Sequence, residues 1–444
     1  MLNFNFNTFI RFFLFIALLS SFILKIYNLT FSIMSILLLY EFIVSKDFNS
    51  KIISIFLFTY FFIPFLNIST YRGSISFNTL TFYCCSNIFI LLILYIFSHK
   101  NQKKISVTYI NQNISLYMFA FIHILLSYIL IGYIYYRYGN ILVNQEIRFM
   151  ISPTLGYLIK STIYIPLIFS LIKRKKSIRY YFTFMVLPLF PAFLLGSRGT
   201  VIMIILGVLF IFILMQKEKK SFINKINIHY KEIKRRHLLF GLSISTVILY
   251  GIFYVRRIGS EVYVSSAELV KKYFDVAIPV FFIYMILPIY FNLRETVGIT
   301  NTIIQDNLRN DGIIPMFFLE IFTILPGKQD SPGILLGELI GKVGDAGLTP
   351  GMIGGLYLDL GFWAVIFPCI FIFLISYFYQ RSSNSDIFKL LYVLSLIQFF
   401  HIYHRGFLKL EYIMSFIIIL IYLSLSGAFK LKNENSSHSL SIDT

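Results

Sequence analysis

The sequence is poor in charge and in groups suited to redox or metal chemistry. Only 13% of its 444 residues are charged, and 20 of them are acidic. There are three cysteines, all within apolar runs, and the adjacent pair Cys84 and Cys85 is badly placed to form a disulfide. There is no zinc-ligand spacing, P-loop, nucleophile elbow or dinucleotide fingerprint. We therefore expect no metal and no cofactor.

What the chain has instead is apolar residues, which make up 57% of it. Runs long enough to cross a hydrocarbon core of about 30 Å recur along the whole sequence. Lipid offers no partners to backbone N–H and C=O groups, so such spans are helical. The sequence predicts an all-α polytopic membrane protein, a single transmembrane domain over 1–444 with about 12 spans. The predicted spans are 8–26, 30–45, 52–68, 79–98, 112–135, 153–172, 180–195, 200–216, 238–255, 353–379, 387–403 and 409–427.

The net charge of +19 is distributed as a topology signal. Alternate connections between the predicted spans carry 21 Lys and Arg in one set and 5 in the short loops of the other. By the positive-inside rule the first set, with both termini, is cytoplasmic. This distribution favours membrane lipids with acidic headgroups as the partner of the basic residues, and it argues against nucleic acid.

One large segment, 256–352, is predicted to lie outside the cytoplasm between the ninth and tenth spans. A capping-box pattern at 265–268 predicts a helix start, and the apolar stretches 276–291 and 313–325 are expected to form surface-lying or re-entrant helices. The end of this segment is dense in glycine, which suits a compact lid. The polar tail 433–444 is expected to be a disordered cytoplasmic segment.

Arg198 is the most unusual charge in the chain. It lies in Gly196-Ser197-Arg198-Gly199, a tight turn between two apolar runs on the predicted outer face. Glycines let a backbone turn sharply and let a ligand come close, and a guanidinium offers a fork of donors suited to phosphate. The turn therefore predicts an anion site at the membrane surface.

Further arginines occupy the predicted outer face, where the positive-inside rule expects few. They are Arg72, Arg137, Arg148, Arg256, Arg257, Arg294 and Arg405. Such a set can bind a phosphorylated lipid or sugar. The alternative for each arginine is an ion pair with Glu146, Glu261, Glu295 or Asp359, or a contact with a lipid headgroup.

Two further patterns contain candidate acid–base groups. His404 and Arg405 end the eleventh predicted span, within His401-Ile402-Tyr403-His404-Arg405-Gly406. A histidine there is a candidate general base or an interfacial hydrogen-bonding group. Asp359 lies in Tyr357-Leu358-Asp359-Leu360-Gly361 near the start of the tenth span. It is a candidate base, a hydrogen-bonding partner of a sugar hydroxyl, or, most simply, the partner of a nearby arginine.

Taken together, these features resemble the bacterial O-antigen polymerases, the Wzy-type oligosaccharide repeat-unit polymerases. The resemblance rests on residues 196–199, 357–361 and 405–406, in that order, and on a large outer loop late in the chain. It implies a GT-C-like glycosyltransferase of the bacterial inner membrane that needs no metal. The enzyme would join undecaprenyl-diphosphate-linked repeat units at the periplasmic face, with lipid diphosphate as the leaving group. A chain-length regulator protein is a candidate partner.

The resemblance also suggests roles for residues. Arg198 and Arg405 would bind the diphosphate as it leaves, with Arg256, Arg257 and the glycines Gly196 and Gly199 completing that site. The proton of the acceptor hydroxyl would pass to His404 or Asp359. Two alternatives remain open: an O-antigen ligase or other lipid-linked glycan transferase, and a non-enzymatic transporter of lipid-linked glycans.

Overall fold

The computed structural model of the chain is helical throughout the part it describes, which contains no strand. The described residues are 6–98, 110, 113–139, 151–172, 178–222, 287–324, 331–341, 348–383 and 385–427. The helices of the first part are α1 (Phe6–Ile23), α2 (Tyr27–Val44), α3 (Phe48–Phe65), α4 (Phe77–Ser98), α5 (Ile114–Tyr138), α7 (Pro153–Lys160), α8 (Ile165–Leu171), α9 (Ile178–Tyr181), α10 (Leu189–Leu194) and α11 (Arg198–Phe222). Those of the second part are α15 (Leu287–Gln305), α16 (Met316–Leu319), α17 (Pro332–Leu339), α18 (Gly351–Leu360), α19 (Pro368–Arg381), α20 (Asp386–Arg405) and α21 (Leu410–Leu425).

Among the described residues, six helices are long and apolar enough to cross a membrane, and α18 with α19 make a seventh if that bent pair is one span. Four shorter apolar helices lie at 7–23, 179–194, 199–215 and 410–425. Every predicted span except the ninth therefore coincides with helix. The ninth, 238–255, lies outside the described residues. The membrane character of the chain follows from these helices, while the count of about 12 spans stays a prediction.

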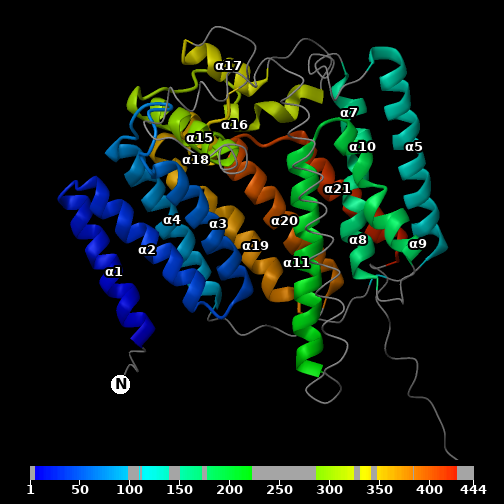
Figure 1. Ribbon diagram of the computed structural model, residues 1–444, viewed down its shortest axis with the longest axis horizontal. Coiled ribbons are helices and arrows are strands. Elements are labelled where there is room, and N and C mark those ends of the chain that lie inside the picture. Colours follow the sequence, from blue (N-terminus) through cyan, green and yellow to red (C-terminus); the bar gives the residue numbers. More distant parts are fainter. Residues whose placement is uncertain are drawn as a thin grey trace, which may run out of the picture. The chain divides into compact units, whose positions relative to one another are not determined.

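The chain divides into two compact units. Unit 1 contains α1 to α4, α15 to α19 and the C-terminal part of α20. In it, the start of α3 and the ends of α4 and α19 come together at one end, because Asn49 bonds Ser376 at 3.1 Å and Gln380 bonds the carbonyl of Phe97 at 2.7 Å. We call this the Asp47 end. The opposite end carries the connection between α3 and α4, helices α15 to α18 and the last residue of α20; we call it the Arg405 end (Figure 1).

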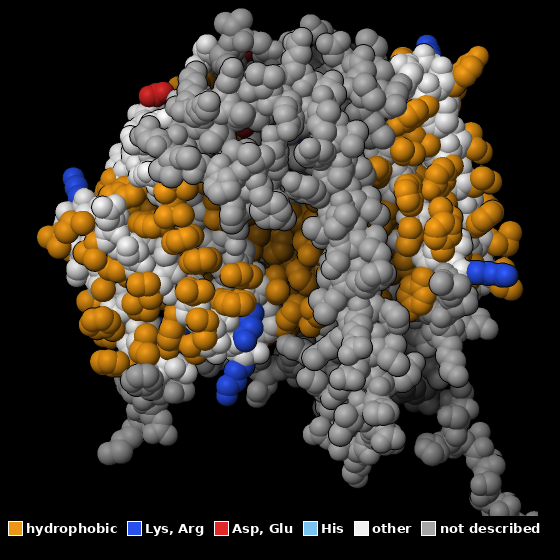
Figure 2. All heavy atoms as spheres, in the orientation of Figure 1, with side chains coloured by type: hydrophobic (Ala, Val, Ile, Leu, Met, Phe, Trp, Pro, Cys, Tyr) orange, Lys and Arg blue, Asp and Glu red, His pale blue; other side chains and the backbone are white. Residues whose placement is uncertain are grey.

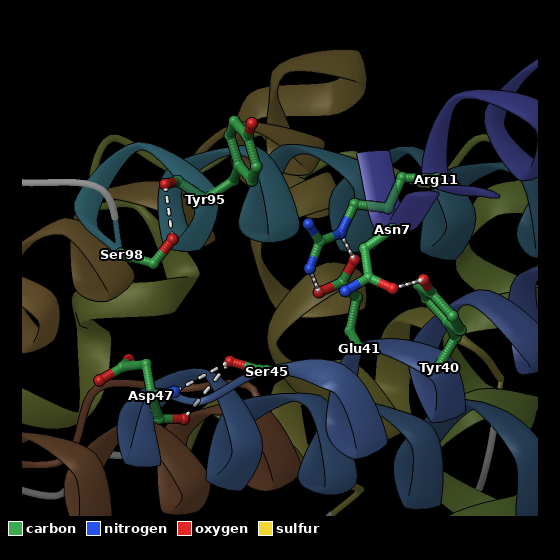
Figure 3. Close-up of polar contacts among 8 residues, drawn as sticks. All are labelled: Asn7, Arg11, Tyr40, Glu41, Ser45, Asp47, Tyr95 and Ser98. Atoms are coloured by element: carbon green, nitrogen blue, oxygen red, sulfur yellow. Dashed lines mark hydrogen bonds and ion pairs between the residues drawn. The ribbon is translucent and has the colours of Figure 1, made fainter. Parts of the chain in front are cut away.

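Near the Asp47 end, an ion pair joins α1 to α2 (Figure 3). Arg11 donates through Nε and Nη2 to the two carboxylate oxygens of Glu41, at 2.5 and 3.0 Å. The same guanidinium lies 5.6 Å from the ring of Tyr95 on α4, and Asn7 accepts a bond from Tyr40 beside it. A charge is costly within lipid unless paired. The fork-to-fork pair thus accounts for a glutamate and an arginine within apolar helices.

At the Arg405 end, α15 overlaps one of the two stretches in which the sequence predicted surface-lying or re-entrant helices. The helix begins at Leu287, inside the apolar stretch 276–291, and packs against α3, α4 and α18. Its buried side includes the polar residues Arg294, Thr300 and Asn301. The stretch 313–325 forms only the short α16 and a following 3₁₀ turn. The predicted helix start at 265–268 and the tail 433–444 lie outside the described residues.

The predicted tenth span is not one straight helix. After Leu360 a 3₁₀ turn, Gly361–Val365, leads into α19, and the two arms differ in direction by 77°. Gly361 stands at the break with φ +59°, and Pro368 begins the second arm. We call residues 361–367 the elbow. Eight of the ten residues of α18 are buried, which is typical of a helix covered by protein.

Unit 2 contains α5, α7 to α11, the start of α20 and most of α21. Its small core joins Ile131 and Ile134 of α5 to Ile159 and Leu195. Two of its predicted spans contain a turn that is not α-helical. A 3₁₀ turn, Ser161–Tyr164, separates α7 from α8, and a π-helical turn, Phe182–Val186, separates α9 from α10.

Apolar side chains cover the described outer surface of both units (Figure 2). On unit 1 they include Phe12 and Phe13 of α1, and on unit 2 Phe121 and Ile129 of α5. Exposure of such surfaces to water is unfavourable, and a soluble protein rarely exposes them over so wide an area. Their solvent is therefore lipid.

Candidate functional site

Three glycines bring the end of α20 against the start of α18. Gly406 follows α20 with φ +86°, and Gly351 opens α18 with φ +67°. A Cβ on Gly406 would lie 2.5 Å from the carbonyl oxygen of Gly351, and a Cβ on Gly355 would overlap the carbonyl oxygen of Gly406. Only glycine permits such an approach of two backbones. The two candidate regions that the sequence placed at 349–361 and 401–406 are thus neighbours in space.

Helix α15 supports this contact from the other side. The hydroxyl of Thr300 bonds the carbonyl oxygen of Pro350, just before α18. A Cβ on Gly354 would lie 2.6 Å from that hydroxyl oxygen, and one on Gly351 would lie 2.7 Å from the methyl group of Thr296. The last turn of α20 is therefore held in a fixed position by α15 and α18.

Arg405 is the last residue of α20, and its side chain is exposed. It forms no ion pair with any described residue, and its charge acts on Tyr60, His401 and His404 nearby. A cation at a helix C-terminus gains about 0.3–1 kcal/mol from the helix dipole, which is a structural reason for its presence. Its donors nevertheless stay available to an anion.

The two histidines beside Arg405 each have a buried ring nitrogen without a bonded partner among the described residues. These atoms are Nε2 of His401 and Nδ1 of His404. The ring of His401 stacks on Tyr412 at 5.7 Å, and that of His404 meets the edge of Tyr60 at 5.8 Å. A buried polar atom without a partner costs about 1–3 kcal/mol. A ligand hydroxyl or water that bonds these nitrogens would recover that energy.

Asp359 has a structural task. Its Oδ1 accepts bonds from Asn310 Nδ2 at 2.9 Å and from the backbone N–H of Met316 at 2.8 Å, and its Oδ2 accepts from the N–H of Phe317 at 2.8 Å. The carboxylate thus caps the N-terminus of α16. No described arginine pairs with it, so the simplest expectation from the sequence, an Asp359–arginine pair, is not what these contacts show.

The other members of the pattern 357–361 dock the same loop. Arg309 Nη1 donates to the carbonyl oxygen of Tyr357 at 2.6 Å, and its guanidinium lies 4.2 Å from the Tyr357 ring. A Cβ on Gly361 would lie 2.7 Å from two nitrogens of that guanidinium, so the glycine makes room for Arg309. The sequence did not single out Arg309. The pattern Tyr-x-Asp-x-Gly, which the resemblance associates with function, here fastens residues 309–317 to α18.

Two of the predicted outer arginines have structural partners. Arg72 pairs with Glu295 at 2.7 Å, one of the carboxylates proposed from the sequence. Arg294 is fully buried and donates to four acceptors, Pro64 O in the last turn of α3 and Asn67 Oδ1, Tyr71 O and Gly73 O in the connection between α3 and α4. Burial lowers the pKa of Arg294, but its ordinary value is so high that it stays charged. Both residues fix this connection to α15.

At the turn around Arg198, α10 ends and α11 begins a few residues later. Gly196 has φ +73°, its N–H bonds Phe193 O at 2.7 Å, and the N–H of Ser197 bonds Ala192 O at 2.9 Å. This pair of bonds is a Schellman motif, which requires a left-handed residue and so explains Gly196. Arg198 is the first residue of α11. Gly199 is helical, exposed, and has open space where a Cβ would lie, so packing does not require glycine there.

The structure brings some of the predicted site residues together but not all of them. Arg405, His404, Asp359 and the glycines around them belong to unit 1, whereas Gly196, Arg198 and Gly199 belong to unit 2, and each group is described within its own unit. The placement of the Arg198 side chain, of Arg256 and Arg257, and of Arg148 lies outside what the structure describes. No cluster of metal-ligating side chains occurs among the described residues.

Sequence reasoning missed a polar network in unit 2. His123 on α5 has Nδ1 at 3.0 Å from the hydroxyl of Tyr422 and Nε2 at 2.7 Å from that of Ser161. Because Ser161 donates to Leu158 O at 2.6 Å, His123 donates to Ser161 and accepts from Tyr422. The network ties the break between α7 and α8 to α5 and α21. A lone histidine in an apolar run was the signal that could have indicated it.

Comparisons with protein-family models, curated proteins and solved structures find no match to this chain.

Proposed function

We propose that the chain is a glycosyltransferase that polymerises undecaprenyl-diphosphate-linked oligosaccharide units at the outer face of the bacterial inner membrane. The observation that supports the proposal best is that the Arg405 side chain is exposed and has no ion-pair partner among the described residues. Among the arginines that the structure describes at the Arg405 end, Arg72 and Arg294 have acidic or carbonyl partners, and Arg309 bonds Tyr357. Arg405 alone in that set is exposed and forms no ion pair with a described residue.

The groups around Arg405 suit the transfer chemistry. In the proposed step the anomeric carbon of the donor sugar forms a bond to the acceptor hydroxyl oxygen and its bond to the diphosphate oxygen breaks. Negative charge grows on the diphosphate, and a fixed guanidinium stabilises it. The hydroxyl proton passes to a base, for which His404 is the better candidate because Nδ1 has no bonded partner. Asp359 is the weaker candidate because its two oxygens already accept three bonds.

Arg198 remains in the proposal as a second diphosphate ligand, with Gly196 and Gly199 beside it and with Arg256 and Arg257 as further candidates. The position of Arg198 at the start of the 25-residue α11 supports this role, because helix N-termini attract anions. The open space at Gly199 would let a phosphate approach the backbone N–H groups.

The test replaces Arg405 in cells that depend on this chain for their surface polysaccharide. We expect Arg405→Ala to abolish polymer while the protein still reaches the membrane, and Arg405→Lys to restore part of it. The matched control is Arg137→Ala, since Arg137 is also exposed but its contacts within the described part of the chain are with Tyr133 and Tyr138 of its own helix. A normal polymer ladder in Arg405→Ala would refute the assigned role.

The surface glycan of cells without the gene separates the two enzyme classes. Loss of a polymerase leaves lipopolysaccharide with a single repeat unit, whereas loss of a ligase leaves an uncapped core.

A further inference from the structure

The only tryptophan of the chain, Trp363, lies in the elbow between α18 and α19. It is 66% exposed, and its neighbour Phe362 is 64% exposed. If these two aromatic side chains face water, each loses about 1.5–3 kcal/mol of the free energy that burial would provide. An apolar occupant of this surface would recover this free energy, and the described residues do not provide one.

The level of the elbow in the membrane follows from α20. This helix has 20 residues, so at 1.5 Å per residue it is about 30 Å long, which matches the hydrocarbon core. Its end is fixed to α18, since Gly406 meets the backbone at Gly351 and Gly355. Helix α18 consequently lies at the boundary where α20 leaves the hydrocarbon core, and not at mid-membrane.

From this boundary α19 turns back toward the Asp47 end. The two arms of the bent pair, residues 351–365 and Pro368–Arg381, differ in direction by 77°, and Gln380 near the end of α19 bonds the carbonyl of Phe97 at the Asp47 end. Exposed apolar residues continue after Trp363: Ile366 lies between the two arms, and Ile370, Phe373 and Leu374 lie on α19. The last three are spaced i, i+3 and i+4, which places them on one face of α19. Phe362 and Trp363 thus precede an apolar stripe on the lipid-facing side of α19.

The protein side of the elbow is polar and fixed. Arg309 lies against Gly361, and Asn310 joins the preceding loop to Asp359. In the same loop Ile313 is fully exposed. A surface with charged and amide groups on one side and indole and phenyl rings on the other matches the boundary between headgroups and acyl chains, where tryptophan is enriched.

We propose that the elbow is an interfacial membrane anchor: Phe362 and Trp363 insert into the headgroup–acyl boundary of the leaflet at the Arg405 end. The occupant of this surface is phospholipid, because the elbow leads directly into the stripe on the lipid-facing side of α19. The anchor sets the height of α18, and through Gly355 and Gly406 the height of Arg405, relative to the headgroups. This inference depends on the membrane character of the chain and not on the proposed transferase activity.

The single tryptophan makes the test direct. The full-length protein is reconstituted into phosphatidylcholine vesicles whose acyl chains carry bromine either near the headgroup or near the chain end, and indole emission is recorded. We expect the shallow bromines to quench Trp363 more strongly than the deep ones. We also expect an emission maximum between those of water-exposed and fully buried indole.

A second tryptophan position calibrates the depth. Phe373 lies on α19, five residues beyond Pro368 and so about 7–8 Å along that helix, and is 47% exposed. In a Trp363→Phe, Phe373→Trp double variant the quenching should shift toward the deep bromines. Stronger quenching of Trp363 itself by the deep bromines would overturn the interfacial placement. Protection of Trp363 from lipid-borne bromine and from aqueous acrylamide alike would show that protein, a second copy or another part of the chain, covers the elbow.

Discussion

At the scale of single residues, Asp359 shows how a catalytic interpretation and a structural one can compete for one side chain. The sequence placed an acid near the start of a span, where a charge needs a reason. Its partners are two backbone N–H groups more than 40 positions away, at Met316 and Phe317. Backbone donors carry no residue-specific signal, so no sequence pattern could have predicted this cap.

The capping role makes a definite prediction for Asp359→Asn. An amide can accept only at its oxygen, so one of the N–H groups of α16 would face an NH₂ group instead of an acceptor. We expect the free energy of unfolding to fall by about 1–3 kcal/mol, while the transfer activity of each folded molecule is retained. Thermal unfolding and polymer synthesis, measured on the same purified samples, check this. An unchanged melting temperature together with abolished activity would instead assign Asp359 to the chemistry.

The arginines could be predicted only as a set. From the sequence, each arginine could either bind an anion or form an ion pair. In the structure, the described arginines differ in which of these partners they have. Arg72 has Glu295, Arg294 has four oxygen acceptors, and Arg405 has no ion pair within the described part. Which carbonyls surround Arg294 depends on the path of the connection between α3 and α4, which composition does not determine.

At the scale of helices, the apolar runs predicted where helices occur but not where they break. The run lengths reflect the need to cross the hydrocarbon core, so all the predicted spans that the structure describes are helical. Pro166, Pro188 and Pro368 stand beside the breaks and were visible in the sequence. Proline indicates that a hydrogen bond is missing, but the direction of the next arm is set by packing, so the 77° bend was not predictable.

Two glycines at helix ends should respond to substitution in opposite ways. Gly406→Ala places a Cβ at φ +86° and against the carbonyl of Gly351, so we expect a loss of more than about 1 kcal/mol in the free energy of unfolding. Gly199→Ala meets open space within α11, so we expect stability to rise by about 0.5–1 kcal/mol.

The activity of the stable variant is the informative measurement for Gly199. If a diphosphate approaches the start of α11, the added methyl group would lower transfer without lowering the melting temperature in detergent. Wild-type activity in Gly199→Ala would leave Gly199 without a role in binding. Equal melting temperatures for Gly406→Ala and the wild type would contradict the close contact between α18 and α20.

At the scale of the whole molecule, the charge pattern predicts which connections share a side of the membrane, and this stays a prediction. Within unit 1, the start of α3 and the last part of α19 meet near one end, where Asn49 bonds Ser376. The connection at 69–78 and the residues after α20 lie at the other, each against α15 or its neighbours. Successive connections lie at alternate ends when consecutive helices cross the membrane in opposite directions. The division into two units, in contrast, could not be predicted, because neither a change in composition nor a linker marks it in the sequence.

Which end faces the cytoplasm is a separate question, and cysteine labelling in cells can decide it. Ile313 at the Arg405 end and Lys46 at the Asp47 end are both exposed, so Ile313→Cys and Lys46→Cys are matched reporters in a chain whose three native cysteines are replaced by alanine. We expect a membrane-impermeant maleimide to label Ile313→Cys while the inner membrane is intact, and Lys46→Cys only after it is opened, because the connection 46–51 belongs to the basic set that the positive-inside rule predicts to be cytoplasmic. The reverse order would place Arg405 in the cytoplasm and remove the proposed periplasmic polymerase. Labelling of both positions under the same condition would contradict the two-ended arrangement of unit 1 itself.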